Sequence, residues 1–187
     1  MDQKINLDFL SNLKLKEVRQ IGIIINDIES SLKHYKSIFN IKSWYRTYQP
    51  EVEIYYKGNP VNIDYDVYLG YSGQLQFELI KVNSGDPNIY DNLVLNRKDG
   101  IHHLAFFVSD YDKKLQGFLD SGVEVLQYGI SKASGGATTR FAYFDTIDNC
   151  GVITEIIETK LYGISVGISE ILLQLGRLTG DASKYSI

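Results

Sequence analysis

The chain of 187 residues has one cysteine, Cys150, and no long run of apolar residues. A single cysteine excludes an internal disulfide and is typical of a reducing compartment, so a cytoplasmic location is expected. A transmembrane helix needs ~18 or more consecutive apolar residues, and no such stretch occurs. The first residues, Met-Asp-Gln-Lys, lack the basic and then apolar order of a signal peptide, so none is expected.

Positive charge is also scarce. Lys and Arg number 19 against 23 Asp and Glu, which gives a formal net charge of −4. The lysines are scattered rather than gathered into the basic face that nucleic-acid binding requires. We therefore expect neither a nucleic-acid nor a membrane partner.

An internal repeat is the strongest feature of the sequence. The stretch Gln20–Asp27 and the stretch His103–Asp110 each begin with a polar residue, run through mostly apolar residues and reach Asp seven positions on. Short runs of Ile, Val and Phe predict buried strands, and each Asp suits a helix N-cap. The helical spacing that follows in the two copies is carried by Ile28, Leu32, Tyr35 and Phe39, and by Tyr111, Leu115 and Phe118.

Each copy then continues into extended segments, so each module is predicted to be a strand, a helix and about three antiparallel strands. The predicted fold class is α+β, with two βαβββ modules. The predicted modules span residues 15–82 and 99–158, with a linker at 83–98 and a helical extension at 159–187. Gly122 is expected to end the second helix.

Four polar residues stand where buried strands should be apolar. Gln20 and His103 open the repeated strands, whereas Glu78 and Glu155 lie in the last strand of each module. A buried carboxylate is costly unless it is paired or binds a metal. Each residue alone has a plain structural reading, such as a solvent-facing Glu or a hydrogen-bonded core histidine. Together, one nitrogen and three oxygen donors at matched positions suit a divalent ion such as Zn, Ni, Co, Mn or Mg.

With these residues the chain resembles the glyoxalase, bleomycin-resistance and dioxygenase superfamily, the vicinal oxygen chelate proteins. The resemblance covers about residues 16–158 and rests on the segments 18–23, 100–106 and 151–158. It implies that the paired βαβββ modules form a curved mixed sheet around a metal-binding cleft, with His103 as the ligand and His102 pointing away from the cleft.

Within the superfamily the chain looks most similar to the methylmalonyl-CoA epimerase-like branch, although those proteins carry His where this chain has Gln20. The order Gln, Glu, His, Glu resembles glyoxalase I instead. Ile24 and Asp99 occupy positions where that enzyme has basic residues for glutathione. The epimerases' additional carboxylate has four candidates here, each with a solvent-facing alternative: Glu51, Glu53, Asp64 and Asp66.

The resemblance implies a small-molecule substrate and proton transfer next to a carbonyl, by an epimerase or by a glyoxalase I-like lyase. Glu155 is the expected base, and Glu78 is expected to remain a ligand or to act on the opposite face. A ring-cleaving dioxygenase needs two histidines, and only His103 is in a matched position. A non-catalytic small-molecule binding or resistance protein is the other alternative, with an aromatic-lined cleft to which Tyr65 and Tyr68 are candidates.

The tail carries an apolar helical stripe from Ile168 to Leu178. We expect this helix to pack on the outside of the sheet or on a second subunit, which makes a homodimer an expected assembly. A lid over the cleft is the alternative. The loop 134–137, rich in glycine, either borders the cleft or merely joins two strands.

Overall fold

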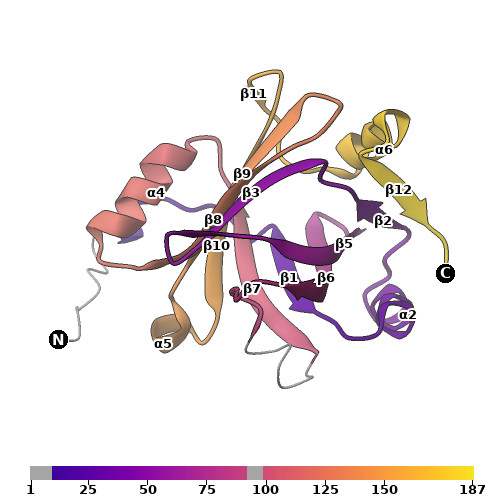
Figure 1. Ribbon diagram of the computed structural model, residues 1–187, viewed down its shortest axis with the longest axis horizontal. Helices are drawn as coiled ribbons and strands as arrows, with labels where there is room; N and C mark the ends of the chain where they lie inside the picture. Colours follow the sequence, from indigo (N-terminus) through magenta and orange to yellow (C-terminus); the bar gives the residue numbers. More distant parts are fainter. Residues whose placement is uncertain (1–9, 92–98) are drawn as a thin grey trace.

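A single curved sheet organises the chain, as the computed structural model shows for residues 10–91 and 99–187 (Figure 1). Within these residues twelve strands join in the order β12-β2-β5-β6-β1-β7-β10-β9-β8-β3-β4, and β11 pairs with β10. The strands are β1 (Gln20–Ile24), β2 (Trp44–Thr47), β3 (Glu51–Tyr56), β4 (Asn59–Val61), β5 (Ile63–Ser72), β6 (Leu75–Gly85), β7 (Gly100–Phe107), β8 (Val125–Lys132), β9 (Ala137–Phe144), β10 (Ile153–Leu161), β11 (Ile164–Ser165) and β12 (Ala182–Tyr185). The helices are α2 (Ile28–Ile38), α4 (Tyr111–Asp120), α5 (Ile147–Cys150) and α6 (Glu170–Thr179).

The centre of the sheet repeats itself, as the sequence does. The opening strands of the two copies, β1 and β7, pair antiparallel to each other. Each also has a parallel neighbour, the closing strand of its own copy: β6 beside β1 and β10 beside β7. The predicted α+β class with a curved mixed sheet is therefore confirmed.

The first copy also contributes a hairpin that the sequence did not predict. Strands β3 and β4 do not pair with the rest of their own copy; β3 pairs antiparallel with β8 of the second copy. The chain crosses from β2, near one end of the strand order, to β3, near the other. The hairpin thus connects the two copies by backbone hydrogen bonds.

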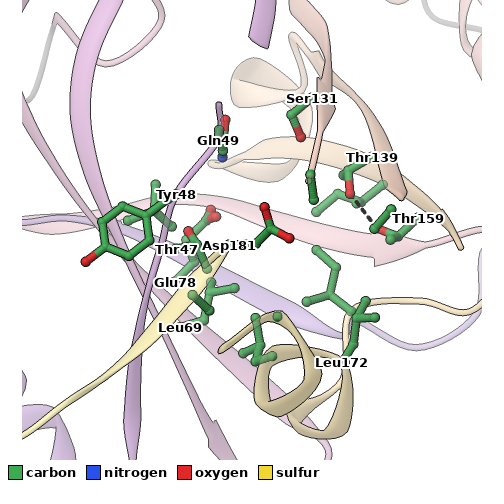
Figure 2. A pocket seen from close by; sticks show the side chains of 18 of the residues that line it. Thr47, Tyr48, Gln49, Leu69, Glu78, Ser131, Thr139, Thr159, Leu172 and Asp181 are labelled. Atoms are coloured by element: carbon green, nitrogen blue, oxygen red, sulfur yellow. Dashed lines mark hydrogen bonds between the residues drawn. The ribbon is translucent and has the colours of Figure 1, made fainter. Parts of the chain in front are cut away.

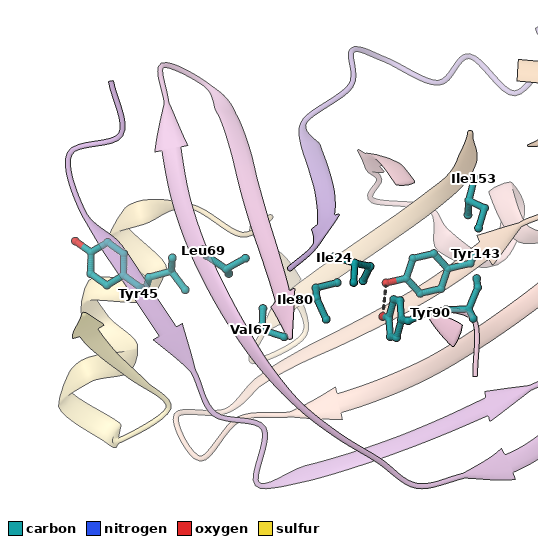
Figure 3. Close-up of a cluster of buried hydrophobic side chains, with 10 residues drawn as sticks. Ile24, Tyr45, Val67, Leu69, Ile80, Tyr90, Tyr143 and Ile153 are labelled. Atoms are coloured by element: carbon teal, nitrogen blue, oxygen red, sulfur yellow. Dashed lines mark hydrogen bonds between the residues drawn. The ribbon is translucent and has the colours of Figure 1, made fainter. Parts of the chain in front are cut away.

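Side-chain alternation along the strands divides the core into an inner and two outer parts. On β6, Phe77 and Leu79 face outward into a cluster with Leu32 of α2. On β10, Ile156 faces outward into a cluster with Phe118 of α4. The inner face carries a third cluster (Figure 3), whose buried members are Ile24, Tyr45, Val67, Leu69, Ile80, Ile89, Tyr90, Tyr143, Ile153 and Leu173.

The two repeated helices are bounded nearly as predicted. The carboxylate of Asp27 accepts a hydrogen bond from the Ser30 amide at 2.7 Å, which caps α2. Asp110 precedes α4 but makes no capping hydrogen bond with its side chain, so that part of the prediction is wrong. Its carboxylate lies 3.4 Å from the Lys114 ammonium instead. Gly122 follows α4 at φ 83°, in the left-handed region that glycine adopts without strain.

The C-terminal helix differs from the placement that we expected. Helix α6 does not pack on the outer face of the sheet: Leu172 and Leu173 line the cavity inside it, so the lid alternative describes its position. Ile171 and Leu178, which belong to the predicted stripe, remain exposed. Among the residues described, no helix has the length and apolarity that a membrane crossing demands.

Candidate metal centre

Two rows of residues across the four central strands bring the predicted ligands together. In one row, Glu78 of β6 and His103 of β7 lie on either side of Gly22 of β1. In the next row, Gln20 of β1 and Glu155 of β10 lie on either side of Ala105 of β7. Each row therefore holds two polar side chains separated by a small residue, all on the inner face of the sheet.

The separating residue Gly22 is required by the geometry. A Cβ built there would lie 1.7 Å from Cε1 of His103, far closer than any real contact. The His103 ring therefore occupies the space that any other side chain at position 22 would fill. Glycine at this position lets the imidazole lie across the strand and reach the two carboxylates.

Three of the four predicted residues have ligand atoms within 4.8 Å of one another: Glu78, His103 and Glu155. The His103 Nε2 lies 3.1 Å from Glu155 Oε2 and 3.3 Å from Glu78 Oε2. Ligand atoms bonded to one divalent ion at ~2.0–2.2 Å come to lie roughly 3 Å apart. These separations therefore fit a shared ion.

Buried polar atoms without hydrogen-bonding partners occur in three of the four predicted ligands. His103 Nε2, Glu155 Oε2 and Gln20 Oε1 find no partner with hydrogen-bonding geometry anywhere in residues 10–91 and 99–187. Buried polar atoms in native proteins nearly always have a partner, so three such atoms from the predicted ligand set need one. The donor set of one imidazole nitrogen and three oxygens fits a divalent ion.

A hydrogen-bond relay fixes which nitrogen of His103 faces this point. His102 Nε2 lies 3.1 Å from the carbonyl oxygen of Ile89, which only accepts, so His102 carries its proton there. His102 Nδ1 then accepts from His103 Nδ1–H, at 3.0 Å. His103 Nε2 is therefore the ring nitrogen that faces the carboxylates, as in metal sites where the other ring nitrogen of the ligand is held.

This arrangement corrects the expectation that His102 points away from the cleft. The register between β1 and β7 shifts at this position: Gly22 is opposite His103, whereas Ile23 is opposite Ile101. His102 is thus an extra residue, a β-bulge, and the bulge turns both histidines inward. His102 is buried and packs against Tyr90, with ring centroids 4.9 Å apart.

A second relay orients Gln20. The Tyr71 hydroxyl donates to the carbonyl of Ile168 at 3.2 Å, and its oxygen accepts a hydrogen bond from Gln76 Nε2. Gln76 Oε1 then accepts from Gln20 Nε2 at 2.7 Å. Each bond determines the next, so the Oε1 of Gln20 is the atom left without a partner. Both relays begin at a backbone carbonyl and end at a candidate ligand.

Electrostatics in the cluster follow from burial and proximity. Burial alone lowers the pKa of His103, but the charges of Glu155 and Glu78 raise it to about 9. Burial, together with the charge of His103, lowers the pKa of His102 to about 3, so His102 stays neutral in its relay. Burial raises the pKa of Glu155, while His103 acts in the opposite direction.

A cavity of about 290 Å³ opens over the cluster and reaches α6 (Figure 2). Gln20, Glu78 and Glu155 line it, and His103 is fully buried beneath them. Of the two tyrosines considered for an aromatic cleft, Tyr65 lines the cavity, whereas Tyr68 lies in the outer core beside α2.

Other sequence candidates lie outside the cavity. Asp64 and Asp66 line a separate hollow beside its mouth, where Asp66 forms an ion pair with Arg46. Glu51 and Glu53 are exposed on β3. None of these four carboxylates is brought to the cluster. Cys150 is exposed in α5, and the loop 134–137 does border the cavity through Gly135 and Ala137.

The structure adds residues that sequence reasoning did not single out. Gly22 makes room for His103, Gln76 orients Gln20, and the hydroxyls of Tyr90 and Tyr143 meet at 3.2 Å beside the cluster. Gln76 carried a signal: it is polar, in a strand, two positions before Glu78, and therefore on the same face. The other three look like ordinary strand or core residues in the sequence.

Comparison with known proteins agrees with this arrangement. The sequence model of the glyoxalase/bleomycin resistance protein/dioxygenase superfamily matches residues 19–143. The chain belongs to this superfamily. The match includes Gln20, Glu78 and His103, whereas Glu155 lies beyond it and joins the other three through the pairing of β10 with β7. The resemblance stated from the sequence is therefore confirmed.

Solved structures share the fold of this chain. A hypothetical protein from Bacillus halodurans is similar at 20% identity and a TM-score of 0.57, over 77% of this chain and 94% of that one. Methylmalonyl-CoA epimerase from Mycobacterium tuberculosis is similar at 16% identity and a TM-score of 0.53, over 76% of this chain and 87% of that one. A 4-hydroxymandelate synthase mutant from Streptomyces coelicolor is similar at 16% identity and a TM-score of 0.52, over 78% of this chain and 49% of that one. No curated protein matches the chain.

Proposed function

We propose that the chain is a divalent-metal-dependent enzyme that moves a proton on a carbon next to a carbonyl group. Gln20, Glu78, His103 and Glu155 hold the ion. The observation that carries the proposal is the convergence of ligand atoms from Glu78, His103 and Glu155 within 4.8 Å of one another. Two of these atoms, His103 Nε2 and Glu155 Oε2, are buried without a hydrogen-bonding partner and lie 3.1 Å apart. Such atoms are costly to bury unless a ligand satisfies them.

A bound divalent ion supplies Lewis acidity to a substrate carbonyl, which makes the neighbouring carbon–hydrogen bond more acidic. Glu155 is the base in this proposal because it is 2% exposed and lines the cavity. Burial raises the pKa of its carboxyl, which favours holding the abstracted proton. Glu78 reaches the cavity from β6, which β1 and β7 separate from β10.

The fate of the proton distinguishes two reactions at the same site. Return of the proton to the opposite face of the same carbon is epimerisation. One of the solved structures with this fold is named methylmalonyl-CoA epimerase. Return of the proton to the neighbouring carbon gives an isomerisation like that of glyoxalase I, which is classed as a lyase. We favour the epimerase reaction because Glu78 and Glu155 approach the cavity from different strands, β6 and β10, and so offer two carboxylates for two faces.

The test combines metal analysis with hydrogen exchange. Elemental analysis should find one divalent ion per chain, lost in a Glu78→Ala/His103→Ala variant. Proton–deuterium exchange in D₂O should then be followed by NMR on acyl thioesters and on thiol adducts of 2-oxoaldehydes. Glu155→Gln should abolish exchange, whereas Glu53→Gln on the exposed β3 should not.

Three outcomes would count against the proposal in different ways. A protein without metal after reconstitution would refute the metal centre. Stoichiometric metal without exchange in any probe would favour the non-catalytic binding alternative. Full exchange by metal-loaded Glu155→Gln would show that Glu155 is not the base.

A further inference from the structure

Among residues 10–91 and 99–187, no side chain that lines the cavity above the cluster neutralises an anion. Its charged lining residues are Glu78, Glu155 and Asp181, all acidic. Within the described part of the chain, no lysine or arginine lines it. A divalent ion bound by the two glutamates balances their charges and leaves no positive charge for a second anion.

Three cations near the cavity form ion pairs that keep them from it. Arg46, in the hollow beside the mouth, forms an ion pair with Asp66. On β10, Ile157 and Thr159 face the cavity, so Glu158 between them faces outward. There its carboxylate lies 2.7 Å from the Arg140 guanidinium and 3.0 Å from the Lys160 ammonium. Arg140 and Lys160 therefore pair with Glu158 on the outer face of the sheet, away from the cavity.

The cavity walls beyond the cluster are mostly apolar. Helix α6 contributes Leu172 and Leu173, and the facing strands β5, β6, β9 and β10 contribute further apolar side chains. The polar exceptions are uncharged or already paired: the hydroxyls of Thr139 and Thr159 meet at 2.9 Å (Figure 2). The larger apolar lining residues from these strands are Val67, Leu69, Ile80, Phe141, Ile157 and Leu161.

From this lining we infer that the substrate is an uncharged molecule with an apolar body, whose oxygen-bearing end reaches the cluster and whose apolar end lies against α6. This inference rests on the proposed function, which supplies the ion at the cluster. A carboxylate or phosphate on the body of the substrate would be buried without a counter-charge, which is strongly unfavourable. Acidic acyl thioesters and glutathione adducts are therefore poor fits for this cavity.

A matched pair of chelating probes tests the inference by binding alone. Octanohydroxamic acid and suberic acid monohydroxamate share the metal-binding end and the eight-carbon chain, but the second ends in a carboxylate. Calorimetric titration of the metal-loaded protein should show that the uncharged probe binds at least tenfold more tightly, which corresponds to about 1.4 kcal/mol.

Three variants of α6 complete the test. Leu172→Arg places a cation in the cavity wall and should reduce the preference to less than about threefold or reverse it. Leu175→Arg, at a lining position that is 51% exposed, should act in the same direction with less risk to folding. Leu178→Arg, on the same helix but 84% exposed and outside the lining, should leave the preference unchanged.

The outcomes separate this inference from the proposed function. Equal affinity for both probes in the metal-loaded wild type, or no binding of either, overturns the uncharged substrate class and leaves the metal centre intact. Failure of the protein to hold a divalent ion overturns the proposed function itself. An unchanged preference in both Leu172→Arg and Leu175→Arg, with both variants folded by circular dichroism, shows that α6 does not meet the substrate.

Discussion

Gly22 lies directly against the imidazole of His103, and a methyl group at position 22 would overlap the ring. Because the backbone of β1 is paired on both sides, it cannot move away to make room. Gly22→Ala should therefore displace His103 and weaken divalent-metal binding by ~10–100-fold, the range seen when the support of a ligand is lost.

Gly100→Ala is the matched control for this substitution. Gly100 also lies in a strand, but nothing stands within 4 Å of a Cβ built there, and its backbone is not in the left-handed region. This variant should bind metal like the wild type. Metal binding by Gly22→Ala equal to that of Gly100→Ala would show that His103 does not need its present position.

The His102 relay predicts a second effect on metal affinity. His102→Ala removes the acceptor for His103 Nδ1–H and frees the ring to turn, so affinity should fall by ~10–100-fold. His102→Asn keeps an acceptor near the position of Nδ1 and should restore most of the loss. His34→Ala, on the exposed face of α2, is the control. Equal losses in the alanine and asparagine variants would point to lost packing rather than to the relay.

The relay to Gln20 gives a related prediction. Gln76→Leu removes the acceptor that holds the Gln20 amide, so that the amide can turn its nitrogen toward the ion. We expect a loss of about tenfold in metal affinity, at the lower end of outer-shell effects. Titration with a competing chelator measures it, with Gln116→Leu on the exposed side of α4 as control. An unchanged affinity would mean that Gln20 does not bind the ion.

Asp181 holds the C-terminal segment over the cavity mouth. Its carboxylate accepts from the amides of Ser134 and Gly135 at 2.7 and 2.8 Å, and its carbonyl accepts from the Tyr48 amide at 2.8 Å. Asp181→Asn should lower the free energy of unfolding by about 1–2 kcal/mol, since it weakens charge-assisted hydrogen bonds. Urea denaturation measures this, with exposed Asp148→Asn as control.

The same residue gives a pH dependence with a definite sign. Hydrogen bonds from Thr179, Gly135 and Ser134 outweigh burial and hold the pKa of Asp181 below its usual 3.8. A carboxyl group whose pKa is lower in the folded than in the unfolded protein stabilises the fold at pH values above its unfolded-state pKa. This stabilisation is lost as the pH falls through the folded-state pKa. The stability gap between wild type and Asp181→Asn should thus be full at neutral pH and shrink below about pH 4. A gap that widened on acidification would contradict this origin.

The candidate site was predictable from the sequence because the duplicated strands have the same register. Gln20 and His103, and likewise Glu78 and Glu155, are polar residues at matched positions, and two-residue alternation places them on one face. The bulge at His102 was not predictable, because a one-residue slip in pairing leaves no mark in composition or spacing. Nor was the pairing of β3 with β8, a contact between segments distant in the chain.

The C-terminal helix shows another limit of sequence patterns. An apolar stripe from Ile168 to Leu178 indicates that a helix has something to cover, but it does not say what. Such a stripe can pack on the outer face of the sheet, on a neighbouring subunit or over the mouth of the cavity. Leu173 is buried while Leu178 is 84% exposed, so even the orientation of the stripe was set by tertiary packing.

The equivalence of Gln20 and His103 has a consequence for how such a site arises. Two identical half-size chains related by a twofold axis would be obliged to present the same residue at both positions, either two amides or two imidazoles. Covalent fusion of the halves removes that obligation, and each position becomes free to mutate on its own. The present chain has one neutral amide and one titratable ring at equivalent positions of its two copies, so the two sides of the site differ in chemistry although the strands that carry them pair in the same way.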